Sequence, residues 1–291
     1  MVDVVKNGSG VRTDGAGLIL NPRYLQPYPF EVYDAAGWYG WMERRWTWVA
    51  VPVSILYVLL IFLGQRYMSR REAFSLRLPL LLWNVSLALG SFWMFLRMVA
   101  EPVEEIKVRG FYQTICSREN HTVISSFWCL IFTLSKVLEF GDTGFIVLRK
   151  QKLIFLHPWH HVTVMLYTFY TFGPTFDPAG RVFGPSNALI HSFMYLYYAS
   201  KSLRLKVPQW VSKGITSMQI LQMIGGLWVN LLSFFGKAVW GDCNHRPWSN
   251  IAWALAMYTS YLVLFLKFFV ASYGRRGGRG GKVINNDNKL D

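Results

Sequence analysis

The sequence is poor in cysteine and in charged residues. Three cysteines among 291 residues are too few for a disulfide-rich scaffold, or for a zinc or iron–sulfur site built on cysteine. Charged residues make up 16% of the chain, whereas soluble domains have about 25%. The first 30 residues are polar and rich in glycine and proline, without the apolar segment of a cleavable signal peptide. These shortages exclude a secreted, disulfide-rich module and indicate that much of the surface faces lipid.

Acidic residues are scarcer than basic ones, at 16 against 30, so the formal net charge is +14. A basic patch on a soluble protein often binds nucleic acid. Here, however, 53% of the residues are apolar and 17% are aromatic, and the apolar ones cluster in blocks close to the roughly 20 residues that cross a membrane. The composition therefore favours a polytopic membrane protein and no nucleic-acid partner.

Seven apolar blocks predict an all-α protein with seven transmembrane helices. The blocks cover residues 47–64, 78–96, 127–148, 153–172, 183–200, 215–235 and 251–270. They divide the chain into an N-terminal tail (1–45), a membrane domain (46–273) and a C-terminal tail (274–291). Residues 1–30 and 274–291 are polar and predict flexible ends.

Lysine and arginine are more frequent in the segments that follow the first, third, fifth and seventh blocks than in the other segments between blocks and at the N-terminus. Because the basic side of a membrane protein is usually cytosolic, this predicts a lumenal N-terminus and a cytosolic C-terminus. Glycosylation sequons begin at Asn7 and Asn120, on the predicted lumenal side.

Cys116 and Cys243 fall in lumenal loops, where thiols can oxidise. We predict that they form a disulfide; two unpaired thiols are the alternative.

The block 127–148 contains side chains that are costly to place inside a bilayer, namely Lys136, Glu139, Asp142 and Thr143. At helical periodicity Lys136, Glu139 and Thr143 share one face, with Asp142 at its margin. Such a face favours a functional cavity. The alternative is an ion pair that only fixes helix packing, and this alternative is compatible with a supporting role in a site.

Three histidines open the next block, at His157, His160 and His161. Pro158 suits the first position of a helix, which predicts that the helix begins there, with His157 near its cap. The positive end of the helix dipole then keeps the imidazoles neutral, so that they can act as bases or nucleophiles. Packing alone is the weaker explanation for histidines so closely spaced.

Two later blocks supply further polar side chains, His191, Tyr195 and Tyr198 from 183–200, and Gln219 and Gln222 from 215–235. Counted at the helical rise from the cytosolic edge, the polar residues of four blocks lie at depths of about 9 to 15 Å, with Lys136 at about 20 Å. A common depth predicts a shared site. Alternatively, the tyrosines form an interfacial belt and the glutamines bond neighbouring helices.

Four segments, 136–143, 157–161, 191–198 and 216–222, resemble in order and spacing the signature motifs of the ELO fatty acid elongases. The resemblance covers residues 45–273. It implies a 3-oxoacyl-CoA synthase of the endoplasmic reticulum membrane, with six of its seven helices arranged as two inverted three-helix units around an acyl tunnel. Lys152, five residues before His157, resembles the residue at this position in the subgroup that elongates saturated and monounsaturated acyl-CoA. Pro158, by contrast, departs from the residues that usually follow the first histidine of this motif.

The resemblance implies condensation of acyl-CoA with malonyl-CoA, without a metal or other cofactor. We expect the acyl group to pass to His160, with His161 and His157 orienting it or moving protons; histidines acting only as bases are the alternative. Cys129 lies inside block 127–148 and is expected to be a small buried residue. The enolate would be stabilised by His191 with help from Asn187, Gln219 or Tyr198. Lys136, Glu139 and Asp142 would support the histidines or contact CoA.

Cytosolic basic residues are candidates for binding the anionic CoA, with a pure topology signal as the alternative. They are Arg149, Lys150, Lys152, Arg204 and Lys206. The resemblance also implies partnership with the 3-ketoacyl-CoA reductase, the dehydratase and the enoyl reductase of the elongation cycle.

Two other functions remain as alternatives at this point. A membrane di-iron desaturase or hydroxylase also carries closely spaced histidines, but of the six here His121 and His245 fall on the lumenal side, which leaves few ligands for two irons. A non-enzymatic seven-helix transporter would use buried polar groups and inverted repeats.

Overall fold

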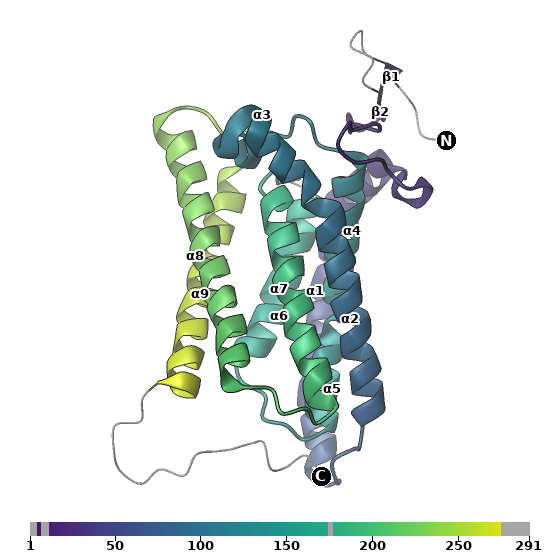
Figure 1. Ribbon diagram of the computed structural model, residues 1–291, viewed down its shortest axis with the longest axis vertical. Coiled ribbons are helices and arrows are strands. Elements are labelled where there is room, and N and C mark those ends of the chain that lie inside the picture. The colour runs from purple at the N-terminus through teal and green to yellow at the C-terminus, as the bar shows by residue number, and fades with distance from the viewer. Residues whose placement is uncertain (1–4, 7–11, 174–176, 275–291) are drawn as a thin grey trace.

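The computed structural model describes residues 5–6, 12–173 and 177–274, and it is almost entirely helical in these ranges (Figure 1). The elements in chain order are β1 (Val5–Lys6), β2 (Arg12–Thr13), the 3₁₀ helix η1 (Pro29–Glu31), α1 (Ala35–Ser69), α2 (Arg77–Met98), α3 (Ala100–Cys116), α4 (Val123–Leu138), α5 (Phe140–Leu148), α6 (Leu156–Phe172), α7 (Gly180–Ser202), α8 (Gln209–Val239) and α9 (Trp248–Tyr273). The two short strands pair antiparallel, Val5 with Thr13.

All seven predicted blocks are helical, and the chain is a multi-pass membrane protein. In the described ranges five helical stretches are long and apolar enough to cross a bilayer, Pro29–Ser69, Arg77–Cys116, Val123–Leu148, Gln209–Val239 and Trp248–Tyr273. The predicted number of seven crossings exceeds this count. Of the two remaining helices, α6 has only 17 residues, and α7 carries polar side chains, including Asn187 and His191.

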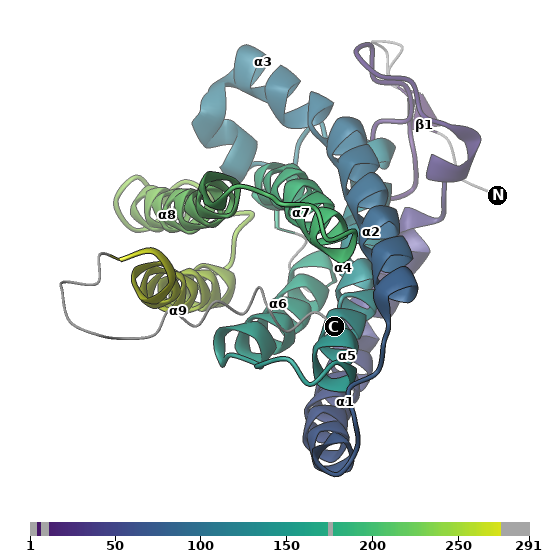
Figure 2. The ribbon, with the colours of Figure 1, turned by 60° about the horizontal axis from the view of Figure 1, so that its bottom comes forward.

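The long helices run side by side, and α3 lies across one end of the bundle, called the α3 end here; the opposite end, where α5 finishes, is called the α5 end (Figure 1). Helix α2 packs along α7, α8 along α9 and α1 along α6; Figure 2 shows the bundle with its α5 end turned forward. At Gly226 of α8 an added Cβ would lie 2.5 Å from the Tyr258 ring of α9. The missing side chain therefore allows this close approach.

Helix α3 was not among the predicted segments, because it is amphipathic rather than apolar, and it changes direction at Gly110, whose φ is 82°. The prediction of a flexible N-terminal end is wrong for the residues from Asp14 onward. Leu18 is buried in a core cluster, and the Ile19 amide donates to the carbonyl of His121 over 2.9 Å. The segment is held by this burial and by a buried ion pair, in which Arg97 of α2 donates to the carboxylate of Glu31, 2.6 Å away.

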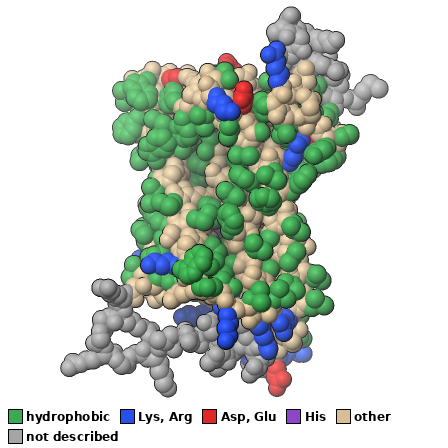
Figure 3. Space-filling model, viewed as in Figure 1, with side chains coloured by type: hydrophobic (Ala, Val, Ile, Leu, Met, Phe, Trp, Pro, Cys, Tyr) green, Lys and Arg blue, Asp and Glu red, His purple; other side chains and the backbone are tan. Residues whose placement is uncertain are grey.

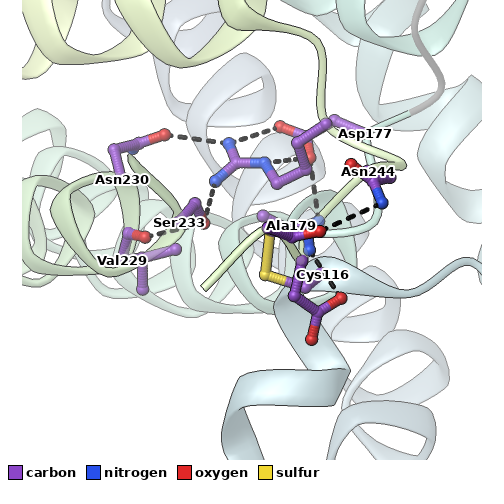
Figure 4. Close-up of a disulfide and its surroundings, with 11 residues drawn as sticks. Cys116, Asp177, Ala179, Val229, Asn230, Ser233 and Asn244 are labelled. Carbon is purple, nitrogen blue, oxygen red and sulfur yellow. Dashed lines mark hydrogen bonds and ion pairs between the residues drawn. A yellow bond between two sulfur atoms is a disulfide. The ribbon is translucent and has the colours of Figure 1, made fainter. Parts of the chain in front are cut away.

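The predicted disulfide between Cys116 and Cys243 is confirmed (Figure 4). It joins the end of α3 to the segment between α8 and α9, beside a second buried ion pair. There Arg246 donates to both carboxylate oxygens of Asp177, over 2.7 and 2.8 Å, and also to Asn230 and Ser233. Burial by itself lowers the pKa of Arg246, but the carboxylate of Asp177 raises it above its ordinary value.

Apolar side chains cover much of the face shown in Figure 3, and Lys and Arg lie towards its two ends, with a group of them at the α5 end. The sequon residue Asn120 is exposed between α3 and α4. The sequon at Asn7 and the C-terminal residues 275–291 lie outside the described residues.

Candidate active site

The polar face of the third predicted block is present, and the helix is interrupted within it. Helix α4 ends at Leu138 and α5 begins at Phe140, so Glu139 occupies the break. The Lys136 ammonium donates to Glu139 over 2.6 Å and to the side-chain oxygen of Asn187 on α7 over 3.3 Å. Both members of the ion pair are buried. This pair therefore ties α4 to α7.

The histidines lie in the first turns of α6, as predicted. The helix begins at Leu156 rather than at Pro158, which a first turn tolerates because the amides there have no partner within the helix. The rings of His157 and His161 are one turn apart, with centroids separated by 4.3 Å. The ring of His160 points differently and lies 5.0 Å from that of Tyr261 on α9. His161 is buried, and its Nδ1 has no hydrogen bond among the described residues.

Thr143 links the third block to the histidines and to a residue that the sequence analysis missed. Its hydroxyl lies 2.9 Å from Nε2 of His157 and 2.7 Å from the hydroxyl of Tyr57 on α1. The neighbours of Tyr57 in the sequence are apolar. The sequence pattern therefore gave no reason to select this single tyrosine of the first predicted span.

Asp142 also has a partner that was missed. The carboxylate accepts hydrogen bonds from Trp83 on α2 over 2.6 Å and from Tyr195 on α7 over 2.8 Å. Asp142 therefore joins three helices at the margin of the polar face, where the helical periodicity placed it.

Helices α7 and α8 contribute unequally to this assembly. His191 is buried, with its Nδ1 3.8 Å from the Glu139 carboxylate. Tyr198, by contrast, is 47% exposed, and its ring packs against Tyr197 rather than among the buried polar groups. Gln219 donates to the sulfur of Met194 over 3.6 Å.

A cavity of about 90 Å³ runs between α4, α6, α7, α8 and α9. His160, Asn187 and Gln222 line it towards the α5 end, while Phe172 and Asp177 line it towards the α3 end. Along α6 the span from His160 to Phe172 is about 18 Å. Among the described histidines only His160 lines this cavity. Apart from these groups and three threonines, Thr133, Thr168 and Thr171, its walls are apolar or aromatic, and the free thiol of Cys129 also lines it.

The basic residues of the α5 end lie in the loops that follow α5 and α7. Lys150, Lys152, Arg204 and Lys206 are exposed, and Arg149 is half-buried. The Lys150 ammonium donates to the backbone carbonyl of Arg71 over 2.9 Å, which ties this loop to the end of α1. In the described part of the chain, no group of three or more His, Cys, Asp and Glu side chains is arranged as a metal site.

Comparison with known proteins gives a consistent result. The family model described as "ELO: GNS1/SUR4 family" matches residues 41–280. The chain is similar to very long chain fatty acid elongase 6 of Drosophila melanogaster (41% identity, covering 82% of this chain and 76% of that protein) and of Homo sapiens (40%, covering 86% and 93%). It is also similar to human very long chain fatty acid elongase 3 (38%, covering 86% and 91%). The chain therefore belongs to the ELO family of fatty acid elongases.

Proposed function

We propose that this fatty acid elongase condenses a fatty acyl-CoA with malonyl-CoA, forming 3-oxoacyl-CoA with release of CO2 and CoA. The observation that carries the proposal is the position of His160 at one end of a cavity with largely apolar walls. An imidazole at one end of an apolar chamber can meet a thioester while the acyl chain lies in the chamber.

The reaction proceeds in two steps. A ring nitrogen of His160 attacks the thioester carbonyl, the C–S bond breaks, and CoA leaves as its thiolate, which takes up the proton that the acylated imidazole loses. Malonyl-CoA then loses CO2, and the resulting enolate attacks the acyl carbon. A carbon–carbon bond forms, the bond to the imidazole breaks, and the imidazole takes up a proton, which restores the histidine. Covalent catalysis of this kind divides one difficult step into two easier ones.

The neighbouring polar groups stabilise the charges that appear. Asn187 and Gln222 line the cavity near His160 and are suited to hold the enolate oxygen or the malonyl carboxylate. His191, beside Glu139, assists from α7. Lys136 and Glu139 hold Asn187 and His191 in place through the contacts described above. His157 and His161 orient the reacting groups or move protons.

The cavity is the proposed acyl tunnel, and Asp177, whose carboxylate accepts hydrogen bonds from Arg246, lines its far end. A longer acyl chain would have to displace this buried ion pair, and separating its two charges is costly. Saturated and monounsaturated chains are the proposed substrates. The exposed basic residues after α5 and α7 attract the phosphates of CoA.

In the membrane of the endoplasmic reticulum, the α3 end is lumenal and the basic α5 end is cytosolic, in accord with the excess of Lys and Arg there. The seven predicted segments all cross, with α2, α4–α5 and α6 forming one three-helix unit and α7, α8 and α9 its inverted counterpart. The reductases and the dehydratase that complete a cycle of elongation are the partners, and the condensation needs no metal or other cofactor.

A microsomal assay with radiolabelled malonyl-CoA and acyl-CoA of graded chain length tests this function. Wild-type protein is expected to incorporate label into chains extended by two carbons, and His160→Ala to lose this activity. His245→Ala is the matched control, because His245 is exposed near the α3 end and lies outside the cavity. Retained elongation in His160→Ala would refute the role of His160, and absence of labelled product from the wild type would refute the condensation.

A further inference from the structure

Tyr57 lies outside the segments that resemble the family motifs, yet it contacts two parts of the histidine cluster. Its side chain is 5% exposed, and its hydroxyl bonds Thr143 over 2.7 Å. The same threonine oxygen lies 2.9 Å from Nε2 of His157. The Tyr57 ring also stacks on Phe140, with centroids 4.0 Å apart, and lies 6.3 Å from the ring of His161. A continuous chain of hydrogen bonds thus runs from α1 through α5 to α6.

Counting protons restricts what this chain can be. A hydroxyl has one proton to donate, so Thr143 can donate either to Tyr57 or to His157, but not to both. Thr143 is 1% exposed, which leaves little access for water to change the arrangement. The phenol is much more acidic than an aliphatic alcohol, with an ordinary pKa of about 10. It is therefore the stronger donor, so Tyr57 donates to Thr143. Nε2 of His157 is then the one acceptor within reach of the Thr143 proton among the described side chains, and the favoured order is Tyr57 to Thr143 and Thr143 to Nε2 of His157.

This order has a consequence for the imidazole. If Nε2 of a neutral histidine accepts a hydrogen bond, its proton is on Nδ1. The nitrogen that carries the proton can donate a hydrogen bond, and the other nitrogen can accept one. The hydrogen bond with Thr143 also holds the orientation of the ring. His161 has no such hydrogen bond on its Nδ1 among the described residues, and its ring packs against that of His157.

We propose that Tyr57 is a positioning residue for the condensation, and that through Thr143 it fixes the tautomer and orientation of His157. The inference rests on the proposed function, because it assigns a purpose to an ordered His157 only if the histidines carry the reaction. It does not require that Tyr57 touch the substrate.

A double-mutant cycle tests the proposal in the full-length protein. Tyr57→Phe keeps the ring and removes the hydroxyl, Thr143→Val keeps the shape and removes the hydroxyl, and Thr143→Ser keeps the hydroxyl. Loss of one productive hydrogen bond corresponds to about a tenfold change in rate. We expect Tyr57→Phe and Thr143→Val each to lower kcat about tenfold with KM for acyl-CoA within about twofold, and Thr143→Ser to recover most of kcat.

The decisive variant is the double one, Tyr57→Phe with Thr143→Val. If Tyr57 acts through Thr143, the double variant is no slower than Thr143→Val alone, because the second change removes nothing further. Tyr33→Phe is the matched control, since the Tyr33 hydroxyl also bonds a buried hydroxyl, that of Ser126 over 2.6 Å, near the start of α4. We expect it to leave kcat unchanged.

Multiplicative losses in the double variant, or an unchanged kcat in Tyr57→Phe, would overturn the proposal. So would an equal loss in Tyr33→Phe, because the effect would then belong to stability in general. Failure of the proposed function looks different: the wild type would form no elongated product, or His160→Ala would remain active. An active wild type, an inactive His160→Ala and a fully active Tyr57→Phe would refute the role of Tyr57 alone.

Discussion

The ammonium of Lys136 lies 2.6 Å from the carboxylate of Glu139, and both side chains are buried at the break between α4 and α5. Glu139 in turn lies 3.8 Å from Nδ1 of His191, and Lys136 donates to Asn187. The pair is therefore a junction through which α4 holds two polar residues of α7. Its value lies in this placement, since a buried ion pair by itself adds little to stability.

Replacing one member of this ion pair is expected to destabilise the protein more than replacing both members. Lys136→Met or Glu139→Gln alone leaves an unpaired buried charge, at a cost of about 3–5 kcal/mol. The double variant has no unpaired charge, so its thermal midpoint in detergent is expected to lie closer to the wild type than that of either single variant. Its elongation activity is expected to stay low, because Asn187 and His191 lose their anchor. A double variant as unstable as the two losses combined would contradict this explanation.

Phe172 is expected to limit the length of the acyl chain. It lines the far end of the cavity, and Phe172→Ala would enlarge that end, shifting the products towards longer chains. Phe169→Ala is the matched control, because Phe169 is equally buried on the same helix but does not line the cavity. Each change costs about 3–5 kcal/mol of stability. Gas chromatography of the products should separate the two variants; the same chain-length profile in both would contradict the assignment.

The Cys116–Cys243 disulfide is expected to stabilise the α3 end. It closes a sequence separation of 127 residues, and loss of a native disulfide typically costs about 2–5 kcal/mol. Cys116→Ser should therefore lower the thermal midpoint, and reductant should lower that of the wild type to a similar value without further effect on the variant. Cys129→Ser, which removes the free thiol, should remain sensitive to reductant. If reductant left the thermal midpoint of the wild type unchanged, stabilisation by this disulfide would be ruled out.

The exposed lysines of the α5 end are expected to act on substrate affinity rather than on chemistry. Replacing Lys152 and Lys206 together by alanine should raise KM for acyl-CoA several-fold and leave kcat nearly unchanged. The effect should shrink as salt is added, because exposed charges are screened beyond about 10 Å at 0.1 M. Lys107→Ala, an exposed lysine on α3, is the control. A KM change that is insensitive to salt would indicate that these lysines do not attract the CoA phosphates.

Much of the site followed from local patterns in the sequence. Helical periodicity placed Lys136, Glu139 and Thr143 on one face, and all three are buried. Spacing also put the histidines in the first turns of one helix. These inferences succeed because the geometry of a helix is local: a residue and its neighbour one turn later share a face whatever the rest of the chain does.

What was missed depends on contacts between distant parts of the chain. Tyr57 and Trp83 are separated from their partners, Thr143 and Asp142, by 86 and 59 residues. In the sequence each resembles any aromatic residue of an apolar helix. The ion pair of Glu31 with Arg97 was missed for the same reason, because neither residue shows by itself that it will be buried. Helix α3 was missed because its amphipathic pattern lacks the apolar run that marked the others.

The most direct test of the central claim is a single turnover without malonyl-CoA. Purified wild-type protein is mixed with acyl-CoA alone, free CoA is measured, and the intact protein and its peptides are weighed by mass spectrometry. An acyl-enzyme mechanism predicts release of CoA in proportion to enzyme and a mass increase of one acyl group on the peptide with His160, both absent from His160→Ala. If CoA appears only after malonyl-CoA is added, and no acylated protein forms, the acyl group is transferred directly and the claim is wrong.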